Sequence, residues 1–185
     1  VGSMEMQRMS RLVCFLWMCM LLSLSGCGGR GPQRPSQRSG TKPEIDSTAL
    51  ARMEMNQRLA IAADEEVLRY VQGVEDAERF AQMPFSNAWV CIVEKGDEQS
   101  NSPQKDEVWR LHIKTYALNG RLLLDTEQEY RIGRNELPMC IEMNISEWHR
   151  GTKVKIVAPW YAAYGMMGTE DVPAYENVLL EISIW

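Results

Sequence analysis

The last 35 residues constrain the fold of this chain more than any other part. Residues 153–158 and 178–184 are rich in Val, Ile and Leu and have the pattern of two strands. The loop between them carries a Tyr-Gly pair at Tyr164-Gly165 and a Val-Pro pair at Val172-Pro173. Several features in a fixed order are harder to match by chance than one short motif. This order predicts two strands that flank a structured loop.

The segment before it also reads mainly as strands. Residues 88–94 form a nearly continuous apolar run, and residues 108–118 alternate between apolar and polar side chains. Asn119-Gly120 follows, which is a strong hairpin signal because both central residues of a type I′ turn need positive φ. The returning strand is expected at residues 121–125, and another short strand at residues 130–133.

Two helical regions are predicted. Residues 48–83 have apolar side chains at helical spacing, and Gly73 marks a possible break within them. A second helix is indicated by apolar residues at i, i+4 and i+7, followed by a glycine suited to a C-cap: Ile141, Ile145, Trp148 and Gly151. A helix between β runs predicts an α+β fold, in which an antiparallel sheet packs on one helix.

The N-terminus indicates export. Met9 is the expected start, Arg11 gives a positive charge, and residues 12–24 are apolar but too few to span a bilayer. The run ends in Leu-Ser-Gly-Cys at 24–27, which resembles the lipobox of bacterial lipoproteins. That resemblance implies cleavage before Cys27 and a lipid anchor on its thiol. An ordinary signal peptide that happens to contain a cysteine is the alternative.

Residues 28–43 are polar, and their composition predicts a flexible linker. Its four basic residues either contact anionic lipid head groups or simply keep the linker soluble. From residue 45 onward the chain has 23 acidic and 14 basic residues, a net charge of about −9, which argues against a nucleic-acid partner. We therefore expect a signal peptide (1–26), a lipidated Cys and linker (27–46), a helical segment (47–84) and one further domain (85–185).

Two cysteines remain in the expected folded part. Cys91 and Cys140 could pair in an oxidising compartment, but two buried free thiols are the preferred interpretation. No Cys/His cluster has zinc spacing, and no phosphate-binding loop or serine-nucleophile motif is present in the sequence. We expect neither a metal nor a cofactor.

The C-terminal half resembles the FKBP-type peptidyl-prolyl isomerases. Asn119-Gly120 stands at the family's first hairpin turn, and Leu124-Asp125 is similar to its Phe-Asp pair. Gly133 and Gly151 have the spacing that the family shows between the glycine that ends a strand and the glycine that ends the helix. The Tyr-Gly and Val-Pro pairs match the family's long loop. The helical preface is similar to that of lipid-anchored, gliding-motility-type relatives in Bacteroidetes. This resemblance implies a curved antiparallel sheet wrapped on one helix.

It also implies a chemistry. In the family a shallow apolar cup binds the prolyl segment, and no nucleophile or cofactor is needed. The amide must twist through a barrier of about 20 kcal/mol. A dry pocket that fits the twisted amide lowers this barrier.

The resemblance assigns the site residues. Tyr164 and Asp125 take the catalytic positions, and the substrate-binding positions fall on Ile113, Leu124, Leu137, Ile141, Val172 and Leu180. Ile141 stands where the family has a Trp floor. Read without gaps, the amide donor falls on Pro138, which has no N–H; a one-residue shift would make Leu137 the donor. Each side chain could instead have a purely structural role.

Three functions follow as hypotheses. The first is a weak or degenerate isomerase acting on proline-containing envelope proteins. The second is a non-catalytic module of the same fold that binds partly folded chains as a chaperone. The third is a structural lipoprotein that uses Trp160 and Tyr161 as a partner surface. Residues 28–31 lack an acidic export signal, so we expect a lipid-anchored domain that faces the periplasm, with the outer membrane as the expected site.

Overall fold

The computed structural model describes residues 47–185, which belong to one compact unit. Its strands are β1 (Ala81–Gln82), β2 (Trp89–Glu94), β3 (Val108–Ala117), β4 (Leu122–Arg131), β5 (Lys153–Ala158) and β6 (Val178–Ile184). Its helical elements are α2 (Ser47–Gly73), α3 (Met139–Glu142) and the 3-10 turns η1 (Ala77–Arg79), η2 (Ile145–Glu147) and η3 (Trp160–Ala162). The signal peptide, Cys27 and the linker lie outside the described residues.

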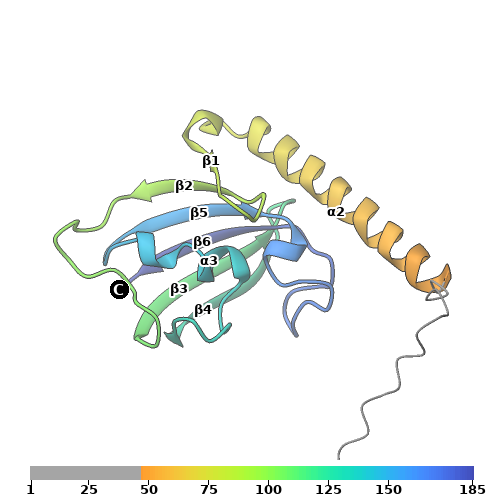
Figure 1. The fold of residues 1–185 in the computed structure, drawn as a ribbon. Coiled ribbons are helices and arrows are strands. Elements are labelled where there is room, and N and C mark those ends of the chain that lie inside the picture. The colour runs from red at the N-terminus through yellow and green to blue at the C-terminus, as the bar shows by residue number, and fades with distance from the viewer. Residues whose placement is uncertain (1–46) are drawn as a thin grey trace, which may run out of the picture. The chain divides into compact units, whose positions relative to one another are not determined.

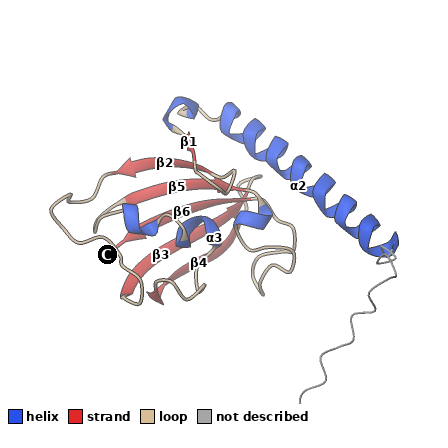
Figure 2. Ribbon diagram, viewed as in Figure 1, coloured by secondary structure: helices blue, strands red, loops and turns tan. Residues whose placement is uncertain are grey.

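All six strands form one antiparallel sheet in the order β1-β2-β5-β6-β3-β4 (Figures 1 and 2). The short helix α3 lies against one face, which we call the inner face, and α2 lies near the other, the outer face. The α+β prediction is therefore confirmed. No helix of residues 47–185 has both the length and the apolar composition needed to span a bilayer.

Strands β5 and β6 have the bounds that the sequence predicts, and the alternation of side chains explains why. Val154, Ile156, Leu180 and Ile182 are buried on the inner face, whereas Lys155 and Glu181 form an ion pair of 3.3 Å on the outer face. A strand that buries one face and exposes the other reads clearly in a sequence.

The β3–β4 hairpin forms as predicted, but the prediction of a type I′ turn is wrong. Gly120 has φ of 87°, whereas Asn119 is not among the described residues with positive φ. The Ala117 N–H donates to Arg121 O at 2.9 Å, and the pairing shifts by one residue between Thr115 and Tyr116. This is a longer hairpin loop with a bulge, in which only the glycine needs the left-handed conformation.

The two short strands predicted at 121–125 and 130–133 are one continuous strand, β4. The residues between them are acidic, a composition that strands disfavour. In the structure these acids face basic residues across the ladder: Glu127 lies opposite His112, and its carboxylate is 3.9 Å from the Arg110 guanidinium. Cross-strand charge pairs make the acidic segment compatible with a sheet.

The predicted helix over residues 141–148 is broken into α3 and η2. Asn144 interrupts it, because its buried side-chain amide donates to Cys140 O at 3.0 Å and so competes with the backbone. Ile141, Ile145 and Trp148 are nevertheless all buried. Gly151 does not cap the helix; it has φ of 88° in the turn where Thr152 N–H donates to His149 O.

The predicted break at Gly73 is confirmed, because helix α2 ends there. The rest of the segment expected to be helical, up to residue 83, contains only the short turn η1 and strand β1. Val67 and Val71 of α2 pack on the outer face against Phe80, Cys91 and Val157. Polar contacts add to this: the Tyr161 hydroxyl donates to the Asp64 carboxylate, and Asn177 Nδ2 donates to Glu66 Oε2 at 2.6 Å.

The first four turns of α2, residues 47–62, bury no side chain. Leu50, Met53, Met55, Leu59 and Ile61 are all exposed there. Packing therefore holds only the C-terminal half of the helix. This division explains why the sequence pattern of the helix is irregular at its beginning and regular from Val67 onward.

Cys91 and Cys140 are both buried and free, as expected. Cys140 lies in the core of the inner face, whereas Cys91 lies under α2 on the outer face. The sheet separates the two thiols, so the fold itself prevents a disulfide between them. Burial raises the pKa of the Cys140 thiol to about 12.

Candidate functional site

Tyr164 lies on the inner face, where the resemblance places it. The segment after η3 carries it over the sheet, and the Gly165 N–H donates to Trp160 O at 2.7 Å. The Tyr164 hydroxyl lies 2.8 Å from Thr115 Oγ1, a fully buried polar atom of β3. Burial raises the pKa of Tyr164 to about 12, although the bond to Thr115 acts in the opposite direction. The phenol is therefore neutral and already has a partner within the protein.

Asp125 lies on the other face of the sheet. It stands opposite Lys114, and residues directly opposite on antiparallel strands share a face. Its Oδ1 lies 2.6 Å from His112 Nε2, and its Oδ2 lies 3.7 Å from Lys114 Nζ. The hydrogen bond to His112 is the main reason that the pKa of Asp125 is lowered. From the sequence, Asp125 and Tyr164 are expected to line one cavity. The structure places them on opposite faces of the sheet instead.

Five of the six expected substrate-binding side chains are core residues. Their exposed fractions are at most 6%: Ile113, Leu137, Ile141, Val172 and Leu180. They belong to one hydrophobic cluster, against which the half-buried Leu124 packs. Side chains buried to this extent leave no open floor for a ligand. The expected cup is thus filled by the protein's own residues.

Pro138 immediately precedes α3, where the resemblance places a backbone amide donor. Its own carbonyl accepts the N–H groups of Ile141 and Glu142 at 2.9 and 3.0 Å. Proline has no N–H, so the residue directly before the helix cannot hold a substrate carbonyl. Leu137, the alternative donor, has only 6% of its surface exposed.

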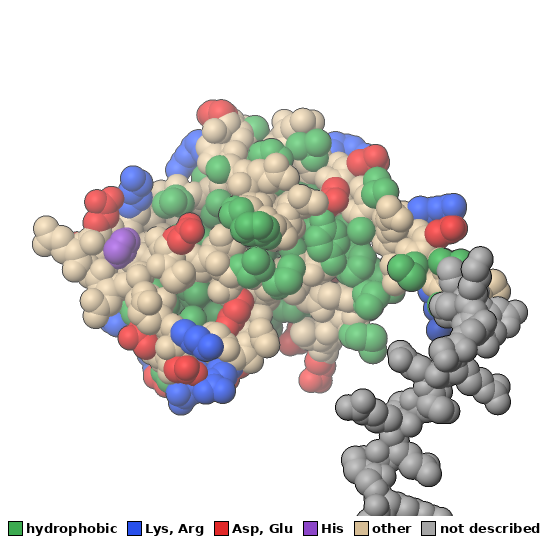
Figure 3. All heavy atoms as spheres, in the orientation of Figure 1, with side chains coloured by type: hydrophobic (Ala, Val, Ile, Leu, Met, Phe, Trp, Pro, Cys, Tyr) green, Lys and Arg blue, Asp and Glu red, His purple; other side chains and the backbone are tan. Residues whose placement is uncertain are grey.

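An apolar rim surrounds this filled centre, and the sequence reading missed it. Exposed side chains of the β1–β2 connection, α3 and the loop after η3 make up the rim: Phe85, Met139, Met143, Met166 and Met167. Phe85 and Met167 are 92% and 87% exposed. Figure 3 shows hydrophobic side chains gathered over these elements. The adjacent methionines between Gly165 and Gly168 were the one available sequence signal.

Hydrogen bonds fix the β1–β2 connection, which carries Phe85, to η3 and α2. Asn87, in the β1–β2 connection, donates from Nδ2 to the Tyr161 hydroxyl and to Asp64 Oδ2, both at 3.2 Å. Phe85 adopts φ of 66°, a left-handed conformation that is uncommon for a bulky residue. Backbone strain of this kind persists only where the surroundings enforce it, and it is concentrated at functional positions.

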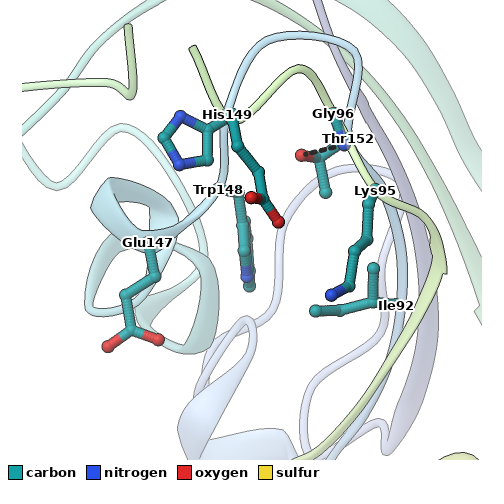
Figure 4. A pocket seen from close by; sticks show the side chains of 8 residues that line it. Ile92, Lys95, Gly96, Glu147, Trp148, His149 and Thr152 are labelled. Carbon is teal, nitrogen blue, oxygen red and sulfur yellow. Dashed lines mark hydrogen bonds between the residues drawn. The ribbon is translucent and has the colours of Figure 1, made fainter. Parts of the chain in front are cut away.

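A separate hollow lies at the other end of β5. Its volume is about 430 Å³, and its walls include Ile92, Lys95, Glu98 and Trp148. In Figure 4, Ile92 and Lys95 face Trp148 across the hollow, and Thr152 bonds the Gly96 N–H at 3.1 Å. None of the residues assigned from the resemblance lines it.

No protein-family model and no curated protein matches the chain. Among solved structures, FkpA from Escherichia coli is similar, with a TM-score of 0.56, 17% identity and coverage of 75% of this chain. This chain spans 63% of that protein's length. A peptidyl-prolyl cis-trans isomerase from Pseudomonas syringae pv. tomato str. DC3000 is similar with a TM-score of 0.55 and 15% identity, over 68% of this chain and 92% of that one. The chain therefore has an FKBP-like fold.

Proposed function

We propose that this chain is an FKBP-like protein of the cell envelope whose isomerase site is degenerate and which binds apolar segments of partly folded polypeptides. The observation that carries the proposal is the contrast between a filled centre and an exposed rim. Ile141 is fully buried, whereas Phe85 is 92% exposed. A fold can be kept while the chemistry of its site is lost.

The rim has the composition expected for adaptable binding. Methionine is unbranched and polarizable, so surfaces rich in it fit many apolar partners. Four of the five rim residues are methionines, and the fifth is an aromatic anchor.

The N-terminal sequence supports the location. A lipobox-like end of the apolar segment supports a lipid anchor on Cys27, which would keep the domain at the membrane surface. The absence of an acidic signal in residues 28–31 supports a periplasmic orientation. The expected partners are envelope proteins that have not yet folded.

Removing the two most exposed rim side chains tests the proposal. In the Phe85→Gly, Met167→Ser variant we expect binding of reduced carboxymethylated α-lactalbumin, a permanently unfolded chain, to weaken at least about tenfold, because two anchors of roughly 1 kcal/mol each are lost. The affinity is measured by fluorescence anisotropy of the labelled α-lactalbumin, titrated with the full chain in phospholipid nanodiscs. Glycine tolerates φ of 66°, so the free energy of unfolding should not fall.

Met53→Ser is the matched control, because Met53 is 68% exposed on α2 and lies outside the rim. It should bind like the unchanged protein. Equal affinity of the rim variant and the unchanged protein would eliminate the rim as the binding surface.

A further inference from the structure

Strand β2 has a free edge. Strand β1 pairs only with Trp89 and Val90, through Gln82 and Ala81. Within residues 47–185, no strand pairs with residues 91–94 on the side away from β5. Ile92 and Val93 are 42% and 41% exposed on this stretch. Unpaired backbone groups beside exposed apolar side chains are a ready template for another strand.

The backbone of Ile92 faces outward from the sheet. The Arg79 guanidinium donates to the Ile92 carbonyl at 3.1 Å, at the position where a neighbouring strand would otherwise bind. In an antiparallel strand the N–H and C=O of one residue point to the same side. The Ile92 N–H therefore also points away from β5. Arg79 is 49% exposed, so its side chain can be displaced.

The hollow beside Trp148 adjoins this edge. Ile92 pairs with Val154, whose side chain is buried on the inner face, so the Ile92 side chain also points to that face and forms a wall of the hollow. Trp148 forms the facing wall (Figure 4). The walls of the hollow carry charges of both signs. Lys95 is positive, Glu98 and Glu147 are negative, and no ion pair joins them.

We propose that the β2 edge and the adjoining hollow form a docking site for an extended polypeptide segment, which adds to the sheet as a further strand. Only an extended backbone offers donors and acceptors that match those of Ile92. The bound segment directs one aliphatic side chain to the inner face, where it contacts Ile92 and Trp148. Charges of both signs suit the polar flanks of a peptide better than an anion or a cation.

This site differs in position and in selectivity from the rim. Thr152, which lines the hollow, precedes β5, whereas η3 and the rim loop follow it. The two ends of β5 lie roughly 17 Å apart, at about 3.3 Å per residue, so Thr152 is far from η3 and the loop after it. The residue that pairs with Ile92 must donate its own N–H, so proline is excluded there. The inference does not depend on the proposed rim function.

Hydrogen exchange of the full chain in nanodiscs tests the docking site, with reduced carboxymethylated α-lactalbumin as the probe. We expect exchange of the Ile92 amide, which points to the free edge, to slow at least threefold when the probe is added. The slowing should persist in the Phe85→Gly, Met167→Ser variant, so that failure of the rim and failure of the edge are distinguishable. No slowing in either protein at saturating probe overturns the proposal.

Two variants test the position of the site, and a concentration series tests its occupant. Ile92→Lys keeps the backbone but places a second ammonium beside Lys95, and it should abolish the slowing at the amide of residue 92. Val108→Lys, a 49% exposed position on the interior strand β3, should leave it unchanged. Slowing that depends on protein concentration in the absence of the probe would identify a second copy as the occupant and would contradict the proposed partner.

Discussion

Ile141→Ala is expected to lower the free energy of unfolding by about 2–5 kcal/mol, because it leaves a cavity in a close-packed core. The Ile141 side chain has no exposed surface and belongs to the cluster that includes Ile113, Ile156 and Leu180. A floor residue of an open cup would have exposed surface, and its truncation would lower the free energy of unfolding less. Urea denaturation of the full chain measures the difference.

Met139→Ala is the matched control for this experiment. Met139 lies on the same turn of helix as Ile141 but is 40% exposed. Its truncation should change the free energy of unfolding by less than about 0.5 kcal/mol. If both variants were equally mild, Ile141 would not be a core residue, and an open prolyl site would have to be reconsidered.

Val67→Asp is expected to detach α2 from the sheet. Val67 is fully buried between the helix and the outer face, and an unpaired carboxyl there costs about 2 kcal/mol or more. The thiol of Cys91 lies under the helix and should then react with a maleimide reagent. Peptide mass spectrometry distinguishes Cys91 from the other cysteines.

Two internal comparisons accompany this variant. Leu68→Asp places the same charge on the neighbouring residue, which is 40% exposed, and should leave Cys91 protected. Cys140 lies on the inner face and should stay unreactive in both variants. If Cys140 became reactive together with Cys91, the substitution would have unfolded the whole unit rather than released the helix.

The part of the fold that is readable from the sequence is the part with regular burial. Strands β5 and β6 have the predicted bounds because they bury one face throughout. Strand β4 and the segment around β1 were misread, because tertiary contacts override local preference there: Glu127 and Glu129 lie opposite basic or polar partners on β3. The interruption at Asn144 depends on one side-chain bond that no periodicity reveals.

The placement of Asp125 shows a limit that is specific to strands. One extra residue in the hairpin moves every following side chain to the opposite face unless a bulge absorbs it. The structure has its irregularity between Thr115 and Tyr116, and this puts Leu124 on the inner face and Asp125 on the outer face. The sequence shows the extra residue but not the position of the bulge. Tyr164 lies on the inner face, beside Thr115, in a loop held between strands of fixed length.

The rim was not predictable for a different reason. Phe85, the Met139 and Met143 pair, and the Met166 and Met167 pair belong to three segments that are far apart in the sequence. Only the folded sheet places the β1–β2 connection, α3 and the loop after η3 together. Apolar residues in a sequence are normally assigned to a core. Their exposure is visible only in the structure, and it is this exposure that distinguishes a binding surface from packing.

The most direct test of a filled cup is a prolyl isomerisation assay. The full chain should not accelerate cis-trans exchange of a proline-containing tetrapeptide, measured by magnetisation-transfer NMR, even at equimolar protein, because the side chains expected to hold the twisted amide are buried in the core. The same preparation should still bind reduced carboxymethylated α-lactalbumin. Acceleration that is retained in Met53→Ser but lost in Tyr164→Phe would contradict a filled cup, and it would show that Tyr164 lines a working isomerase site.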